Sequence, residues 1–321
     1  MPPVHSEKRF HGNKQRRALH DPVAGRTAPW VQAAMSNLRS LLAAGEFITA
    51  PGVFEMFSAR IADRMDFKAL YMTGYGVSVS HLGLADAGLI TYRDMVERAR
   101  TIAGGTSRPL IADADTGFGG LINIRETVRG YESAGVQAIQ IEDQEMPKKC
   151  GHTPNRRVVP LKDMLKRIEV AVESRRSRDF LIIARTDART ALGIDEAIAR
   201  GKAFAKAGAD VVFVESPESA QEFEKVGGEL AGQAWLLANM VPSGRSPEIA
   251  REKLIECGFS IAIYPSVGMT AACAALDSAY RHLAQHGSTI SSPVPAWNMN
   301  QMHDLAGFAD VWAFEKRHVE S

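Results

Sequence analysis

The sequence contains few cysteines, few aromatic residues and almost no net charge. Only three cysteines occur in 321 residues, and 38 basic residues nearly balance 37 acidic ones, for a net charge of +1. A small, odd number of cysteines without paired spacing argues against a disulfide framework or a zinc site and predicts a reducing compartment, the cytoplasm. Without an excess of positive charge, we expect neither a nucleic acid nor a membrane as partner.

Long apolar stretches are also missing. No run approaches the ~18 consecutive apolar residues of a membrane-spanning helix. The first 30 residues carry six Lys or Arg and two acidic residues, but they lack the apolar core of a secretory signal. We interpret residues 1–34 as a flexible basic arm. A transit peptide is the alternative, and Glu7 and Asp21 argue against it.

Residues 35–290 contain a regular alternation of short β-branched runs and amphipathic helical segments. Eight runs predict strands, at residues 46–50, 69–74, 109–115, 138–143, 180–187, 211–216, 235–240 and 261–266. Several helical segments end in glycine shortly before the next strand, as at Gly135, Gly208 and Gly258. Eight such units predict a single (β/α)8 barrel, a fold of the α/β class, over residues 35–290.

A doubly wound sheet is the alternative fold. It usually has fewer strands and a G-x-G-x-x-G turn after the first strand, which "APGVFEMFSAR" lacks. The barrel is therefore favoured. Residues 291–321 follow it as a C-terminal helical extension, in which Phe308, Trp312 and Phe314 need a surface to pack against. A partner subunit would supply one.

Polar residues stand at the C-terminal ends of the predicted strands, where barrel enzymes place their active sites. Asp113, Asp115 and Glu142 would repel one another at one level of the rim, and a divalent cation removes that conflict. Oxygen ligands favour Mg²⁺ or Mn²⁺ over zinc. The alternative is that each acid caps a helix or pairs with Arg185. The other residues of this rim are Tyr71, Thr73, Gly74, Tyr75, Asp143, Asp187, Glu215 and Asn239.

The segment "MPKKCGH", residues 146–152, lies in the connection after the fourth predicted strand. This connection runs from Gln144 to about Pro160, and loops of such length are often lids. Its basic residues suit an anionic substrate held between lid and acidic site. Lysines and a histidine lower the pKa of Cys150, whereas carboxylates raise it. The residues alone leave Cys150 as either a nucleophile or a general acid.

"KKCGH" after "IEDQ", with "ADADTGFGG" upstream and "IIARTDA" downstream, resembles the isocitrate lyase/phosphoenolpyruvate mutase superfamily. The resemblance covers roughly residues 38–315. It implies a (β/α)8 barrel, a Mg²⁺ cofactor and a homotetramer in which the last barrel helix is swapped between subunits. The cysteine of this loop is typical of the lyase branch, which implies cleavage of the C2–C3 bond of a 2-hydroxydicarboxylate.

The resemblance also implies roles for individual residues. Asp113, Asp115 and Glu142 would hold the metal, and Cys150 would be the general acid. His152, Arg185 and Tyr71 are further catalytic candidates, although the acceptor of the hydroxyl proton stays open between Tyr71, water and a carboxylate. The implied substrate contacts are Thr73, Gly74, Tyr75, Gly151, His152, Arg185, Glu215, Asn239 and Pro265.

The substrate class follows from "YPSVGMTA", after the eighth predicted strand. Thr270 stands where similar methylisocitrate lyases carry an arginine. The resemblance therefore favours a 2-alkylmalate or 2,3-dimethylmalate, cleaved to pyruvate or another 2-oxo acid and a carboxylate. Three alternatives remain: methylisocitrate cleavage with Arg245 replacing the arginine, oxaloacetate hydrolysis, and a non-catalytic barrel that binds a dicarboxylate.

Overall fold

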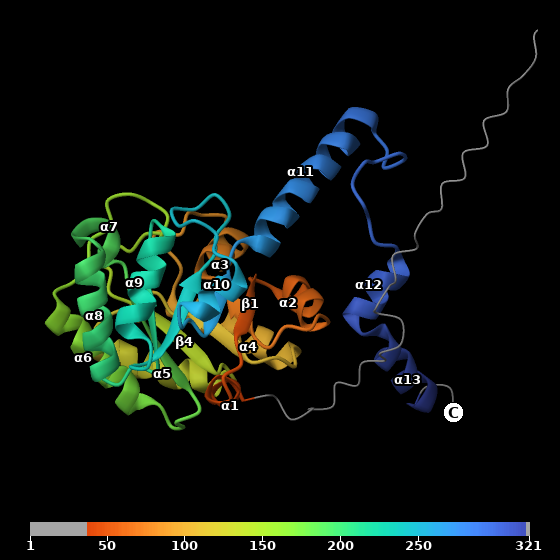
Figure 1. Ribbon diagram of the computed structural model, residues 1–321. Helices are drawn as coiled ribbons and strands as arrows, with labels where there is room; N and C mark the ends of the chain where they lie inside the picture. The colour runs from red at the N-terminus through yellow and green to blue at the C-terminus, as the bar shows by residue number, and fades with distance from the viewer. Residues whose placement is uncertain (1–36, 319–321) are drawn as a thin grey trace, which may run out of the picture. The chain divides into compact units, whose positions relative to one another are not determined.

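The computed structural model describes residues 37–318, so the predicted arm at 1–34 lies outside the described residues. Eight parallel strands close a barrel in sequence order, surrounded by helices (Figure 1). The predicted (β/α)8 fold is thus confirmed. The strands are β1 (Ile48–Val53), β2 (Leu70–Met72), β3 (Leu110–Asp113), β4 (Ala138–Glu142), β5 (Leu181–Thr186), β6 (Val211–Val214), β7 (Trp235–Asn239) and β8 (Ile261–Tyr264).

Helices connect the strands and follow the last one. Gly135, Gly208 and Gly258 all have positive φ angles beyond a helix end, as predicted from their positions. The helices are α1 (Leu38–Ala43), α2 (Met56–Asp63), α3 (Gly74–Val77), the π-helical turn η1 (Ser78–Leu82), α4 (Tyr92–Gly105), α5 (Leu121–Ser133), α6 (Leu161–Ser174), α7 (Ala188–Leu192), α8 (Ile194–Lys206), α9 (Ala220–Leu230), α10 (Arg251–Glu256), α11 (Val267–His286), α12 (Met299–Ala306) and α13 (Phe308–His318).

The first strand differs most from its prediction. Expected at residues 46–50, β1 occupies Ile48–Val53 and includes Pro51 and Gly52. Both residue types are unusual inside strands, so the predicted strand ended too early. The glycine has a packing role: a Cβ on Gly52 would lie 2.2 Å from the carbonyl oxygen of Pro265. Its absence allows β1 to approach the end of β8.

Two apolar layers hold the barrel. One lies between strands and outer helices, and the other fills the barrel interior with residues such as Ile111, Ile183 and Phe213. Leu38 and Leu42 of α1 belong to the interior layer, so α1 closes the N-terminal end of the barrel. With that end packed, the C-terminal strand ends remain for polar chemistry.

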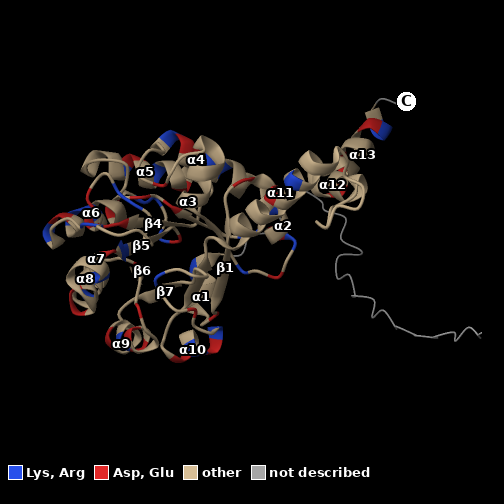
Figure 2. Cartoon of the chain, turned by 90° about the horizontal axis from the view of Figure 1, so that it is seen from above, with Lys and Arg blue, Asp and Glu red and all other residues tan. Residues whose placement is uncertain are grey.

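The outer helices carry both signs of charge, and Figure 2 shows Lys and Arg interspersed with Asp and Glu around the barrel. Ion pairs such as Lys202–Glu229 and Lys253–Glu224, each 2.7 Å or shorter, connect neighbouring helices. Within residues 37–318, no helix is both long and apolar enough to cross a membrane.

The last barrel helix does not cover the barrel. None of the residues of α11 is buried, and the helix projects away from the strands in Figure 1. The chain after α11 contacts the barrel again at α2. Arg60 of α2 donates to the carbonyl of Leu305 at 3.1 Å, and Arg64 pairs with Asp304 at 2.9 Å. The predicted extension is therefore present as α12 and α13. Its large exposed apolar side chains include Trp297, Met299, Phe308, Val311, Trp312 and Phe314.

Candidate active site

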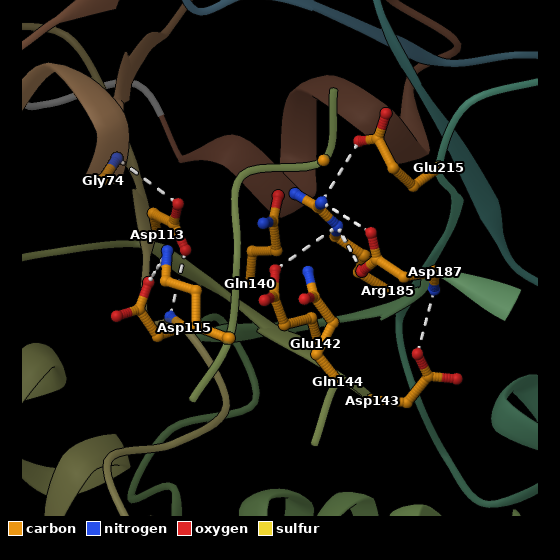
Figure 3. Close-up of polar contacts among 12 residues, drawn as sticks. Gly74, Asp113, Asp115, Gln140, Glu142, Asp143, Gln144, Arg185, Asp187 and Glu215 are labelled. Carbon is orange, nitrogen blue, oxygen red and sulfur yellow. Dashed lines mark hydrogen bonds and ion pairs between the residues drawn. The ribbon is translucent and has the colours of Figure 1, made fainter. Parts of the chain in front are cut away.

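An acidic cluster lies at the C-terminal ends of β3 and β4 (Figure 3). Asp113 ends β3, and its carboxylate accepts hydrogen bonds from the backbone N–H of Asp115 at 3.0 Å and of Gly74 at 3.3 Å. Gly74 has no room for a side chain, since a Cβ would lie 2.6 Å from Asp113 Oδ2. Asp115 lies beyond the strand with a φ of 47°, so a turn sets its direction rather than strand alternation.

Two residues that the sequence interpretation did not assign to the site complete this cluster. Lys148 Nζ lies 2.5 Å from Asp86 Oδ1 and 2.6 Å from Asp115 Oδ1, with its side chain 3% exposed. Asp86 comes from the loop after η1. It was not predicted because the predicted site residues stand at strand ends or in the loop after the fourth strand. A lone acid in the apolar stretch "HLGLADAGLI" was the available signal. We call Asp86, Asp113, Asp115, Glu142 and Lys148 the acidic cluster.

The acidic cluster carries more negative charge than it can balance. Burial raises the pKa of Asp115 to about 7; Lys148 opposes this, whereas Asp113 and Asp86 add to it. Burial likewise raises the pKa of Glu142 well above its ordinary value, although Arg185 lowers it. Glu142 Oε1 is buried without a hydrogen-bond partner. Such oxygens fit a hard divalent cation.

These ligands do not form a finished cage. Among residues 37–318, no three Asp, Glu, His or Cys side chains are grouped closely enough to hold a metal ion. The ammonium group of Lys148 lies between Asp86 and Asp115 instead. The assignment of Asp113, Asp115 and Glu142 as metal ligands therefore stays a prediction, supported by their donor chemistry and excess charge.

An arginine cluster lies beside the acidic one on the rim (Figure 3). Arg185 of β5 donates from Nε and Nη2 to the two carboxylate oxygens of Asp187, both at 2.9 Å. It also lies 3.4 Å from Glu142 and 3.5 Å from Glu215. Burial acts to raise the pKa of Asp187, but Arg185 and Arg156 outweigh it and hold the pKa below its usual range. We call Arg156, Arg185, Asp187 and Glu215 the arginine cluster.

Two amide side chains near the clusters have spare hydrogen-bonding capacity. Asn239 donates to Glu215 Oε2 at 3.1 Å, and Tyr71 donates to Gln140 Oε1 at 3.2 Å. Asn239 Oδ1 and Gln140 Nε2 are buried without partners. Because unpaired buried polar atoms are costly, these two atoms suit a polar ligand. Gln140, inside β4, was not predicted.

The long connection after β4 is confirmed and lies directly on the rim. It runs from Asp143 to Pro160 between β4 and α6. The backbone N–H of Cys150 donates to the carbonyl of Asp86 at 3.2 Å, and Ser216 Oγ donates to the carbonyl of Gly151 at 3.2 Å. A Cβ on Gly151 would lie 2.5 Å from Arg185 Nη2. Only glycine permits so close an approach.

Cys150 is held as a neutral thiol. Burial raises its pKa, and Asp86 adds to this, whereas the backbone N–H of His152 and the charge of Arg185 oppose it. Burial lowers the pKa of His152, whose Nδ1 accepts the backbone N–H of Arg245 at 3.3 Å. A protonated thiol suits a proton donor better than a nucleophile, which would have to be a thiolate.

Some predicted residues make their contacts outside these clusters. Tyr75 is 41% exposed, and Pro265 makes its close approach to Gly52. Thr73 is buried, and its hydroxyl accepts the N–H of Gly76 at 3.4 Å as the N-cap of α3. Thr270 lies on the exposed start of α11 and donates to the carbonyl of Ser266. The substrate contacts assigned to Thr73, Tyr75 and Pro265 stay predictions.

A protein-family model described as phosphoenolpyruvate phosphomutase matches residues 38–284. The chain belongs to this family. The 2,3-dimethylmalate lyase of Eubacterium barkeri is 44% identical over 286 residues, which is 89% of this chain and 96% of that protein. A 2-methylisocitrate lyase of Aeropyrum pernix is 39% identical over 88% of this chain and 89% of its own length. The predicted superfamily is thus confirmed.

Solved structures agree with this placement. Oxaloacetate acetylhydrolase in complex with 3,3-difluorooxalacetate superposes with a TM-score of 0.83 at 36% identity, over 88% of this chain and 96% of that chain. Phosphonopyruvate hydrolase in complex with oxalate and Mg²⁺ gives a TM-score of 0.80 at 28% identity, over 88% and 98%. The family therefore includes several reactions on small anionic acids, and the choice between them depends on this chain's own residues.

Proposed function

We propose that this protein is a Mg²⁺-dependent carbon–carbon lyase that cleaves a 2-alkylmalate or 2,3-dimethylmalate between C2 and C3. The observation that carries the proposal is Cys150, a neutral thiol held between the acidic cluster and Arg185. The name of the Eubacterium barkeri relative supports the substrate class. For 2,3-dimethylmalate, atom balance gives pyruvate and propionate as products.

Asp113, Asp115, Glu142 and Asp86 would hold the metal, which would lower the pKa of the substrate's 2-hydroxyl group. The chain's own groups serve the remaining steps. The backbone N–H of Gly74 and the Arg185 guanidinium bind carboxylates. Removing the hydroxyl proton breaks the C2–C3 bond and leaves the electron pair on the C3 fragment. Arg185 stabilises that charge, and the Cys150 thiol donates a proton to C3.

The acceptor of the hydroxyl proton is better assigned to a carboxylate than to Tyr71. Burial raises the pKa of the Tyr71 phenol well above its ordinary value, and Asp113 adds to this. Such a phenol stays protonated and is a poor base. With the phenol protonated, a carboxylate of the acidic cluster is the acceptor that the chain itself supplies.

A comparison of substrates tests the proposal. Release of the 2-oxo acid product is measured with 2-methylmalate, 2,3-dimethylmalate, malate and 2-methylisocitrate, and release of oxalate is measured with oxaloacetate, each with Mg²⁺. We expect the highest kcat/KM with an alkylmalate. No turnover of any 2-hydroxydicarboxylate would refute the lyase proposal, and cleavage of oxaloacetate alone to oxalate and acetate would move it to a hydrolase.

Methylisocitrate cleavage is the second candidate, favoured by the Aeropyrum pernix relative. It requires a cation for the third carboxylate. Thr270 supplies none, and the side chain of Arg245 lies 3.3 Å from Glu218. These contacts argue for the smaller substrate. A higher kcat/KM for 2-methylisocitrate than for alkylmalates would reverse this order.

We also propose a homotetramer in which α11 is exchanged between subunits. The support is that α11 follows β8 without burying any of its residues, while Leu276, Tyr280 and Leu283 are 44–65% exposed. Light scattering should give four times the subunit mass, and Tyr280→Asp should lower it. The predicted cytoplasmic location fits the three free thiols of the described residues.

A further inference from the structure

One arginine of the loop after β4 is buried, although it stands in a run of charged loop residues. The side chain of Arg156 is 0% exposed, whereas that of the adjacent Arg157 is 79% exposed and pairs with Glu145 at 2.9 Å. Neither the composition of "NRRVV" nor its length distinguishes the two arginines. The burial of Arg156 must therefore be explained by the contacts of its side chain.

The contacts of Arg156 reach the arginine cluster and not the acidic one. Its Nη1 donates to Asp187 Oδ1 and its Nη2 to Thr190 Oγ1, both in short hydrogen bonds, and Nη2 lies 3.4 Å from Ser216 Oγ. Asp187 is the residue whose carboxylate also orients Arg185. One buried carboxylate thus holds a guanidinium from the loop and one from the rim.

A second path leads from Arg156 to the segment that carries the thiol. Ser216 Oγ lies within hydrogen-bond distance of the Gly151 carbonyl and of Glu215 Oε1, at 3.2 and 2.9 Å. At the base of the loop, the N–H of Glu145 donates to the carbonyl of Arg157, and Gln144 bonds both backbone groups of Lys149. Residues 150–155, which include the thiol, therefore lie between two buried basic side chains, Lys148 and Arg156.

We propose that Arg156 is a positioning residue that docks this loop on the barrel and, through Asp187, fixes Arg185 and the Cys150 thiol relative to one another. The proposal rests on the proposed lyase function for its kinetic consequences, but the docking itself does not depend on turnover. Within residues 37–318, the hydrogen bonds and the ion pair of Arg156 reach neither the thiol nor the acidic cluster. It acts only through Asp187, Thr190 and Ser216.

The test compares Arg156→Gln with Arg157→Gln, two substitutions at adjacent loop positions. The first readout is iodoacetamide labelling of Cys150 in the folded, substrate-free protein, mapped by mass spectrometry, with Cys257, outside the site, as the internal standard. We expect Arg156→Gln to speed labelling of Cys150 by roughly 10-fold or more, the factor that one hydrogen bond to a charged group contributes. Arg157→Gln should label at the wild-type rate.

The second readout separates kcat from KM. Arg156→Gln should lower kcat by about 10²-fold, because a displacement of about 1 Å in a reacting group costs that much, and should raise KM through Arg185. Arg156→Lys keeps the charge but not the planar fork, so it should restore only part of both. A merely structural arginine would lower the melting temperature and the active fraction while leaving KM and Cys150 labelling unchanged.

The outcomes are distinguishable from failure of the proposed function. If the wild-type protein cleaves no 2-hydroxydicarboxylate, the labelling experiment still decides the role of Arg156. If Arg156→Gln does not fold, Thr190→Val removes one of its partners and should give intermediate labelling. Wild-type labelling of Cys150 in every variant that folds would overturn the proposal, as would equal effects of Arg156→Gln and Arg157→Gln.

Discussion

The acidic cluster and the arginine cluster lie on one rim but have opposite electrostatic balances. The acidic cluster places four carboxylates around Lys148, and the pKa of Asp115 rises to about 7. The arginine cluster sets two guanidinium groups against Asp187 and Glu215, and the pKa of Asp187 falls. Burial is the same in both clusters. The number of cations in each decides the sign of the shift.

This difference shows which cluster has its charges balanced by the protein's own side chains, without a bound metal ion. In the arginine cluster each guanidinium has a carboxylate partner, so its geometry is already set. The acidic cluster leaves an unpaired oxygen on Glu142 and excess negative charge, so it needs a further cation. The substrate would then lie between the acidic cluster and the prearranged Arg185, next to the loop that carries Cys150.

Removing the metal should cause the largest loss of lyase activity. Exhaustive EDTA treatment should lower lyase activity by roughly 10⁴-fold, since the charge stabilisation that a metal ion provides is worth several kcal/mol. Mg²⁺ or Mn²⁺ should restore activity to the wild type but not to Asp113→Ala. Melting temperatures measured with and without Mg²⁺ should differ for the wild type only. Undiminished activity after chelation would show that the acidic cluster works without a metal.

Replacing the thiol tests the group between the clusters. Cys150→Ser keeps the size of the side chain but is a far weaker acid, so kcat should fall by about 10³-fold while KM changes little. Steady-state kinetics on the best alkylmalate measures this, and Cys257→Ser, outside the site, is the matched control. A variant with near-normal kcat would make the cysteine a bystander.

The sequence predicted the barrel and most of the rim because both depend on local patterns. Eight β-branched runs alternate with amphipathic segments, and polar residues occupy the C-terminal ends of the strands, as at Asp113, Glu142 and Arg185. Asp86 and Arg156 were not predicted as site residues because their roles depend on how two loops fold onto the rim. No periodicity distinguishes Arg156 from Arg157. The predicted bounds of β1 were wrong because Pro51 and Gly52 are unusual in strands.

Changing the geometry of the arginine cluster without changing its charge should have a smaller effect. Arg185→Lys keeps the cation but cannot form two parallel hydrogen bonds with Asp187. We expect kcat/KM to fall by about 10²-fold, through both KM and kcat, because Arg185 binds a carboxylate and stabilises the developing charge, and hydrogen bonds to charged groups are worth about 1.5–3 kcal/mol. The affinity for Mn²⁺, measured by calorimetry, should stay near that of the wild type. A lost metal affinity with unchanged KM would assign Arg185 to the acidic side instead.

The smallest effects concern the hydrogen bonds that support each cluster from behind. Tyr131 donates to the carbonyl of Asp113 at 3.0 Å, and Thr186 Oγ1 donates to Asp143 Oδ2 at 2.7 Å. Tyr131→Phe removes a bond between neutral groups and should lower the free energy of unfolding by about 1 kcal/mol. Thr186→Val removes a bond to a carboxylate and should cost about 2 kcal/mol. Urea unfolding measures both.

Their pH dependence should differ, because Asp143 titrates. Burial raises its pKa to about 6, Asp187 adds to this, and the hydrogen bond from Thr186 opposes it. Since the folded pKa exceeds the unfolded value of about 3.9, the ionised carboxylate costs stability above about pH 6, and this cost fades as the pH falls toward 4. The loss in Thr186→Val should therefore be larger at about pH 8 than at about pH 5. The loss in Tyr131→Phe should be equal at both, and Thr186→Ser should recover stability at the higher pH. Equal losses for Thr186→Val at the two pH values would mean that Asp143 keeps one protonation state between about pH 5 and about pH 8.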